Sequence, residues 1–149
     1  MKFICLGYLN EATWNGKSDD ERKRFMNECF EYHNELQQAG HVVGGEALDS
    51  SRNTVTLRLR DGSVDVSDGP YVETKEVLAG FNVLEARDLN HAIALMSKHP
   101  GLKAGPFEIR AADREVSRMF KEHQAAIGTP SLAMAVRRVN VVGAKTNGA

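Results

Sequence analysis

Two stretches of the chain, residues 3–9 and 77–86, are mostly apolar on both of their alternating faces. A strand with one face in water alternates apolar and polar residues, so both stretches are predicted to be central strands that are covered on two sides. If helices cover only one face of their sheet, the other face stays apolar and needs a partner. We therefore expect a homodimer in which two copies pack sheet to sheet.

Two helices are predicted from the patterns around these strands. The first spans residues 19–39, after a loop at residues 10–17, because Ser18 and Glu21 form a capping-box pattern immediately before an amphipathic run. The second begins after Asp88, a residue type that suits the N-cap position. Both helices are expected to lie on the sheet.

Four shorter strands complete the predicted domain, at residues 42–48, 54–60, 63–66 and 107–111. Asp61-Gly62 is a typical hairpin turn, and Gly44-Gly45 suggests a bulge or a close approach of two backbones. The order strand, helix, strand, hairpin, strand, helix, strand is that of the split βαβ arrangement. The fold class is therefore predicted to be α+β and ferredoxin-like, with an inserted hairpin.

The last part of the chain follows a different pattern. Apolar residues recur at helical spacing between Val116 and Ile127, and a further apolar stretch runs from Leu132 to Val142. Residues 112–149 carry six Lys or Arg and three Asp or Glu, which suits a solvated helix face or a contact with an acidic partner. We expect one domain over residues 1–111, followed by a C-terminal helical extension and tail over 112–149.

The overall composition argues against several classes of protein. The formal net charge is −1, which is unlike a dedicated nucleic-acid binder. The two cysteines form no CxxC pair, and the histidines show no metal-binding spacing. No apolar run approaches membrane-spanning length, and the N-terminus does not resemble a signal peptide. We expect a cytoplasmic protein without a metal or other cofactor and without nucleic-acid or membrane partners.

The run Ser67–Glu76 reads SDGPYVETKE and places a rigid turn and three charges directly before an apolar strand. With VVGGEAL at residues 42–48 and the Asp61-Gly62 turn, it resembles the signature of the DGPF domains of the YCII-related family. Tyr71 stands where Phe is usual, and Val72 where a small residue is common. The resemblance covers roughly residues 1–111 and implies a dimeric α/β barrel.

The resemblance also implies possible functions. In YCII-type relatives a His on the first helix and an Asp near the end of the second have been proposed as an acid–base pair. One relative resembles a cofactor-free dehydrochlorinase of chlorinated aromatic intermediates. Cys29 falls near the position of that His, and His99 near that of the Asp, so neither residue type is retained. Family members also occur beside alternative sigma factors, which implies a sensing or accessory role.

The signature run itself contains candidate functional residues. Asp68 is expected either to cap its turn by accepting backbone N–H bonds or to hold a carboxylate at a pocket mouth. Glu73 and Lys75 share one side of an extended segment. They are expected to form a solvated ion pair or a catalytic pair, in which Lys75 orients an anionic oxygen and Glu73 takes a proton.

Other candidates lie outside the signature. His33, on the first predicted helix, is either a satisfied, partly buried residue or the best general base in the chain. Cys29 is expected to be a small core residue. Glu46 is a pocket candidate, because a carboxylate in such a strand is costly unless it is paired. The aromatic residues expected to pack in the core or rim, or to form an aromatic wall, are Tyr8, Trp14 and Tyr71.

Two functions remain open on these observations. The first is a small cofactor-free acid–base enzyme, of elimination, isomerase or lyase type, acting on a small organic metabolite. The alternative is a non-catalytic dimeric module that binds a ligand or a protein and is linked to sigma-factor regulation. In the enzyme the catalytic residues would be His33, Glu73 and Lys75, and the ligand-binding residues Tyr8, Glu46, Asp68 and Tyr71.

Overall fold

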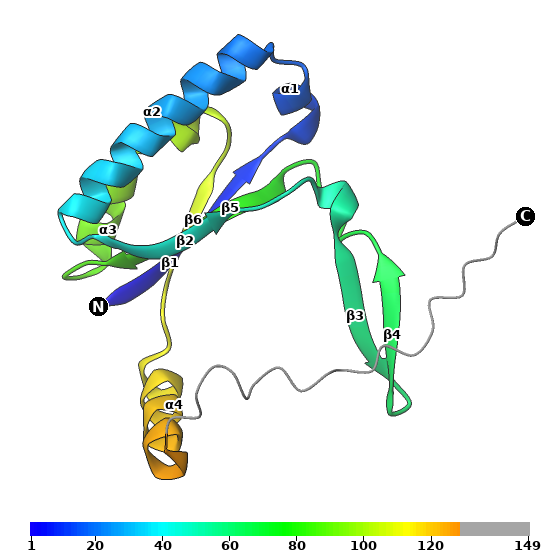
Figure 1. The fold of residues 1–149 in the computed structure, drawn as a ribbon, viewed down its shortest axis with the longest axis vertical. Helices are drawn as coiled ribbons and strands as arrows, with labels where there is room; N and C mark the ends of the chain where they lie inside the picture. Colours follow the sequence, from blue (N-terminus) through cyan, green and yellow to red (C-terminus); the bar gives the residue numbers. More distant parts are fainter. Residues whose placement is uncertain (129–149) are drawn as a thin grey trace, which may run out of the picture. The chain divides into compact units, whose positions relative to one another are not determined.

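The computed structural model describes residues 1–128 and shows an α+β protein, as predicted (Figure 1). The chain divides into two compact units, one of residues Met1–Ala112 and one that begins at Asp113. The apolar stretch from Leu132 to Val142 lies outside the described residues. The elements in chain order are β1 (Lys2–Leu9), α1 (Glu11–Asn15), α2 (Asp19–Gln38), β2 (Val42–Ala47), a 3-10 helix (Ser51–Asn53), β3 (Val55–Arg60), β4 (Ser63–Asp68), β5 (Val77–Glu85), α3 (Leu89–Met96), a 3-10 helix (Pro100–Lys103), β6 (Phe107–Ala111) and α4 (Arg114–Ile127).

The main sheet has four strands in the order β2-β5-β1-β6, and every neighbouring pair is antiparallel. β5 separates β1 from β2, and β1 separates β5 from β6. The chain therefore passes through α2 between β1 and β2, and through α3 between β5 and β6, crossing one strand each time. The two stretches predicted to be central strands are central, as Cys5 shows by pairing with Asn82 on one side and Ile109 on the other.

The long helix α2 begins at the predicted capping box. The Glu21 backbone N–H donates to Ser18 Oγ at 3.2 Å, and the Ser18 N–H donates to Glu21 Oε2 at 2.7 Å. The prediction of a loop at residues 10–17 was wrong, because α1 forms there. The Asn10 side chain caps α1 by accepting a hydrogen bond from the Thr13 N–H at 3.0 Å.

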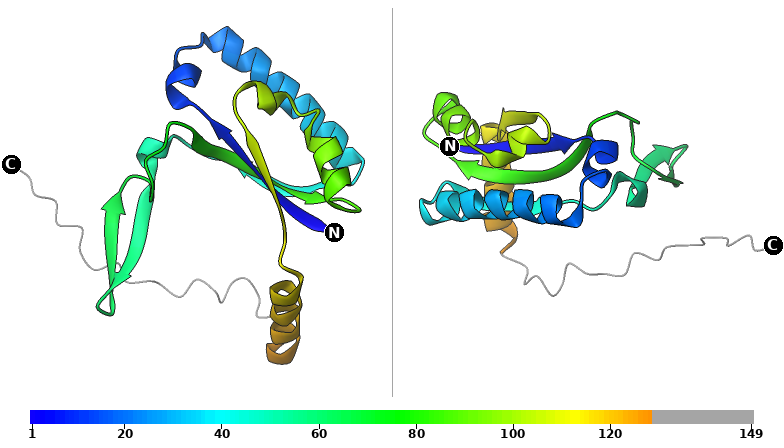
Figure 2. Two further views of the ribbon diagram at one scale, coloured as in Figure 1. Left: turned by 180° about the vertical axis from the view of Figure 1, so that it is seen from behind. Right: turned by 90° about the horizontal axis from the view of Figure 1, so that it is seen from above.

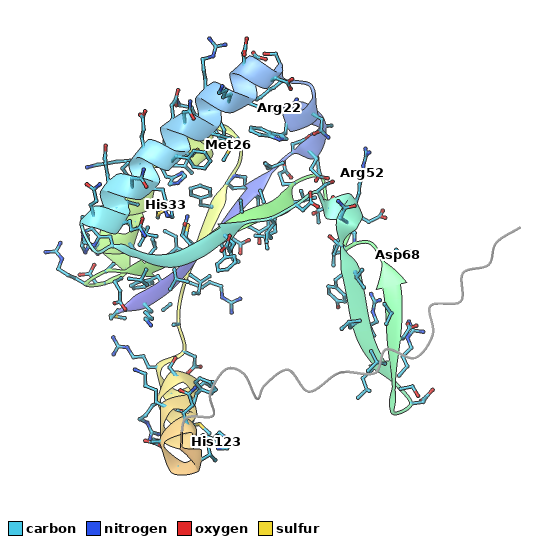
Figure 3. The ribbon with its side chains drawn as sticks, in the orientation of Figure 1. Arg22, Met26, His33, Arg52, Asp68 and His123 are labelled. Atoms are coloured by element: carbon cyan, nitrogen blue, oxygen red, sulfur yellow. The ribbon has the colours of Figure 1, made fainter. Side chains whose placement is uncertain are left out.

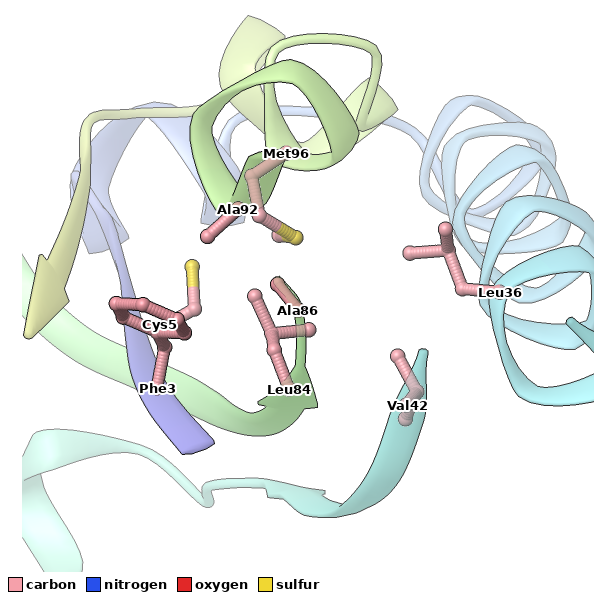
Figure 4. Close-up of a cluster of buried hydrophobic side chains, with 8 residues drawn as sticks. All are labelled: Phe3, Cys5, Leu36, Val42, Leu84, Ala86, Ala92 and Met96. Carbon is pink, nitrogen blue, oxygen red and sulfur yellow. The ribbon is translucent and has the colours of Figure 1, made fainter. Parts of the chain in front are cut away.

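The core lies between the sheet and the two helices α2 and α3, which cover the same sheet face (Figures 1 and 4). Strand alternation directs the intervening side chains of β1 and β5 to the other face, on which no helix of the first unit lies (Figure 1). In the part of the chain that the structure describes, eight hydrophobic residues are buried: Phe3, Cys5, Leu36, Val42, Leu84, Ala86, Ala92 and Met96.

The predicted bulge is present where β2 enters the sheet. The register against β5 shifts between Val42 and Gly44. Gly45 has φ of 147°, and a Cβ built on it would lie 2.4 Å from the Phe81 carbonyl oxygen. Only glycine therefore fits this close approach of two backbones.

The hairpin of β3 and β4 forms a separate two-stranded sheet that extends away from the four-stranded one (Figure 2). Asp61 and Gly62 have φ of 47° and 78°, the positive values that a two-residue hairpin turn of this kind requires. β4 continues to Asp68, two residues beyond its predicted end, because Asp68 still pairs with Val55.

Candidate functional site

A pocket of about 500 Å³ lies between α2 and the sheet, inside the first unit. Helix α2 forms one wall, strands β1 and β5 form the floor, and the turn after α3 closes one side. Apolar pockets of this size with a few convergent polar groups are typical small-molecule sites. The aromatic residues that border it are Tyr8, Trp14, Phe25, Phe30, Phe81 and Phe107, and strand alternation places the Phe81 side chain on the other face of the sheet.

His33 reaches the pocket from α2. Its side chain extends from the side of the helix that faces the sheet, as does that of Met26, two turns earlier (Figure 3). Cys29 lies between them, one turn before His33, and also lines the pocket. The helical repeat therefore brings one imidazole and one thiol to the same wall.

His99 lines the same pocket and is held by its neighbours. The backbone N–H of Gly101 donates to His99 Nδ1 at 2.9 Å, so Nδ1 is an acceptor and a neutral ring carries its proton on Nε2. The ring packs edge to face against Tyr32 and Phe107, at centroid distances of 5.7 and 5.1 Å. Burial, followed by the nearby charge of His33, lowers the pKa of His99.

The thiols near the pocket are protonated. Burial, with the charge of Glu28, raises the pKa of Cys29, and burial raises that of Cys5 to about 11. Only a thiolate is an effective nucleophile, so neither cysteine is prepared for covalent chemistry. The proton-exchanging side chains of this pocket are therefore its two histidines.

Tyr8 and Glu46, both predicted ligand-binding residues, also border the pocket. The Glu46 side chain nevertheless leaves the sheet on its other face. Glu46 pairs with Phe81, which pairs with Leu6, and Leu6 alternates with the buried Cys5. The register of β1 against β5 shifts between Gly7 and Tyr8, so alternation fixes the side of Glu46 alone, whose side chain does not project toward α2.

The predicted residues of the signature run lie away from this pocket. None of Asp68, Tyr71, Glu73 and Lys75 lines it, and all four are exposed. Within residues 1–128, no ion pair joins Glu73 to Lys75 and no hydrogen bond reaches the Asp68 carboxylate. The turn is held instead by Thr56, whose Oγ1 donates to the Gly69 carbonyl at 2.7 Å.

A metal site is not formed by the described part of the chain, where no three His, Cys, Asp or Glu side chains gather closely enough to hold an ion. No helix within residues 1–128 is long and apolar enough to cross a membrane. The cytoplasmic location expected from the sequence stays a prediction.

Comparison with known proteins identifies the family. A sequence model of the YCII-related domain matches residues 1–115. The chain belongs to the YCII-related domain family. An uncharacterized protein of Rhizobium meliloti (strain 1021) is 29% identical over 114 residues, which is 74% of this chain and 90% of that protein. The resemblance drawn from the signature run is thus confirmed, and the reaction has to be argued from the pocket.

The pocket of this YCII-related domain contains one functional candidate that sequence reasoning missed. His99 was placed only at the position of a relative's Asp and was not selected as a site residue. Its neighbours Pro100 and Gly101 carried a usable signal, because a His before a Pro-Gly turn can accept the N–H of that turn. Its closeness to His33 had no such signal, since 66 residues separate them in the sequence.

Proposed function

We propose that this protein is a small acid–base enzyme that acts without a bound cofactor on a small organic metabolite. The observation that carries the proposal is the pocket of about 500 Å³ that contains both His33 and His99. Imidazole is the side chain that most readily exchanges protons near neutral pH. Elimination, isomerisation and lyase reactions need only such proton transfers, and the proposal covers these classes.

The two histidines suit different roles. His33, on the helix wall, is the proposed general base that removes a proton from the substrate. His99 is kept neutral by burial, and its fixed tautomer leaves an Nε2–H donor. Such a donor stabilises negative charge that develops on a substrate oxygen or leaving group as the proton departs.

The signature loop supplies a competing assignment. Glu73 as the base and Lys75 as the group that orients an anionic oxygen stay predictions, as do ligand contacts from Tyr8, Glu46, Asp68 and Tyr71. The chemistry is the same in both assignments, but the base sits on a different element. Variants of His33 and of Glu73 therefore separate them.

We also propose that two copies pack sheet to sheet, as in the dimeric α/β barrels of ferredoxin-like domains. The sheet face away from the helices supports this. Its side chains include Ile4, Leu6, Phe81 and Val83, which alternate with the buried residues of β1 and β5 and are half-buried, with no helix of the first unit over them. An uncovered apolar sheet face marks an interface.

A binding module without catalysis is the second candidate. Helix α4 supports it, because Val116, Met119, Phe120 and Ile127 recur along one helix face and are each more than half exposed. A helix of this kind is typical of a protein contact. A role in sigma-factor regulation would require the bound protein to be a component of that system.

The test combines ligand discovery with proton exchange. A metabolite library is screened by thermal shift, and each compound that raises the melting temperature is then incubated with enzyme in D₂O. The enzyme proposal expects at least one compound to exchange a C–H proton for deuterium, read by ¹H NMR. His33→Gln keeps the size of the side chain without its basicity and should slow this exchange at least about 100-fold.

Two further variants complete the design. His91→Gln alters an imidazole outside the pocket and should leave the exchange rate unchanged. Loss of exchange in Glu73→Ala, with exchange retained in His33→Gln, would move the base to the signature loop. If no compound shifts the melting temperature beyond replicate scatter, the pocket proposal is wrong. Binding without exchange would favour the non-catalytic module.

A further inference from the structure

One face of the β3–β4 hairpin, here called the arm face, consists of aliphatic side chains. Leu57 lies directly opposite Val66, and Leu59 directly opposite Val64. Residues opposite each other in an antiparallel pair project to the same side, and Val55 precedes Leu57 by two positions. The arm face therefore comprises Val55, Leu57, Leu59, Val64 and Val66, with exposed fractions between 56% and 75%, and ends at Asp68, which lies opposite Val55.

The other face of the hairpin is polar. Thr56 lies opposite Ser67, and Arg58 opposite Asp65. Arg58 also stacks over the Tyr71 ring at 5.4 Å. The polar face therefore suits water, whereas the arm face does not. A two-stranded hairpin alone is marginally stable in water, and its stability depends on packing of such a face.

The charges of the hairpin argue against a membrane as the cover. Two arginines and three aspartates lie within residues 55–68, so the segment has a net charge of −1. Arg60 is paired with Asp65 at 3.4 Å. Surfaces that bind anionic lipid carry an excess of Lys and Arg around their apolar residues, which this segment lacks.

We propose that the arm face packs against a second copy of this chain. The inference rests on the homodimer proposed above and names a further surface that holds it. The hairpin is inserted between β2 and β5, so it leaves the same sheet whose open face carries Leu6 and Phe81. The first unit thus carries two uncovered apolar surfaces, the open sheet face and the arm face, on one connected segment of chain.

The size of the arm face suits a dimer contact. Six residues per strand give an arm about 20 Å long. Each of the five arm-face side chains presents roughly 60 Å² of apolar surface, so one arm presents roughly 300 Å². A dimer contains two such contacts, and each contact covers an equal area on the other copy. The two contacts together therefore remove roughly 1,200 Å² from water. This equals the lower limit of stable protein interfaces, about 1,200 Å², before any sheet contact is added. Because each copy uses its arm on the other in the same way, no arm is left for a third copy, and the assembly stops at a dimer.

The experiment compares two charge insertions on opposite faces of the hairpin. Leu57→Asp lies in the arm face, and Ser63→Asp lies on the polar face, opposite Arg60. The dimer Kd of each protein is measured by sedimentation equilibrium. We expect a dimer for the unaltered chain, a Kd raised at least about 30-fold in Leu57→Asp, and a Kd within about threefold in Ser63→Asp.

A second measurement needs no variant and so does not depend on a variant folding. Amide hydrogen exchange is followed across residues 55–68 while the unaltered chain is diluted through its Kd. The arm proposal expects protection of these amides to fall with the dimer fraction. Equal protection in monomer and dimer would overturn it.

The outcomes also distinguish the arm-face contact from the sheet-to-sheet homodimer proposed above. A monomeric unaltered chain at about 100 µM would overturn both. A dimer whose Kd changes by less than about threefold in Leu57→Asp would overturn the arm contact alone and leave the sheet-to-sheet dimer standing.

Discussion

His99 illustrates how local geometry prepares a side chain for chemistry. Its Nδ1 accepts the Gly101 N–H, and its ring packs between Tyr32 and Phe107. A substituted Gly101 would disturb this arrangement, because a Cβ there would lie 2.7 Å from the Phe107 ring and 2.9 Å from His99 Nδ1. The buried glycine and the tautomer of His99 are therefore parts of one local structure.

The lowered pKa of His99 predicts a dependence of stability on pH. As the pH falls below about 6.5, the unfolded chain takes up a proton that folded His99 resists, so the contribution of this residue to stability is complete above that pH and lost below it. His99→Asn retains an acceptor for the Gly101 N–H and cannot titrate. We expect its melting temperature to fall less between pH 7.5 and 5 than that of the unaltered chain.

The control is His123→Asn, which removes an exposed imidazole on α4. Its melting temperature should follow pH as the unaltered chain does. Equal slopes for His99→Asn and the unaltered chain would mean that His99 binds its proton alike in the folded and unfolded states.

Among the elements, β2 has the most demanding local requirement. Gly45 combines a positive φ with a backbone contact that excludes a Cβ, whereas Gly40, after α2, has φ of 76° and nothing within 4 Å of a built Cβ. Both positions favour glycine by conformation, but only Gly45 also requires it by space. Substitution by alanine at the two positions separates these effects.

We expect Gly40→Ala to reduce the free energy of unfolding by about 1 kcal/mol, from conformation alone. Gly45→Ala should cost about 3 kcal/mol or more, because β2 has to move away from Phe81. Urea denaturation of both variants measures the difference. Equal losses would show that the edge strand relaxes without cost and that its close approach to β5 is not needed.

At the scale of the whole molecule, the core belongs to the first unit. All eight hydrophobic residues that are buried within residues 1–128 lie between Phe3 and Met96, and α4 contains no buried residue. A chain that ends after Ala112 should therefore fold cooperatively, with a melting temperature within about 5 °C of that of the full chain.

A matched truncation after Pro106 removes β6, whose Phe107 and Ile109 pack against the core. This shorter chain should lose its cooperative thermal transition, as followed by circular dichroism. A cooperative transition in the chain ending at Pro106, or none in the chain ending at Ala112, would contradict this view of the first unit.

Sequence alone determined what depends on neighbours in the chain. The capping box at Ser18, the Asp61-Gly62 turn and the apolar stretches of β1 and β5 are local patterns, and each folds as its pattern predicts. The signature run identified the family. The short helix α1 was missed, because an Asn N-cap with only five helical residues behind it gives too few periodic positions to recognise.

Tertiary structure decided which distant side chains meet. His33 and His99 share a pocket because the path of α2 over the sheet and the turn after α3 bring them to one side of it, whereas the exposed loop keeps Glu73 and Lys75 away. The face on which Glu46 projects depends on the register of β2 against β5, and one bulge residue changes it. Contacts of this kind result from the packing of whole helices and strands, and the local sequence of neither contacting segment contains a pattern that predicts them.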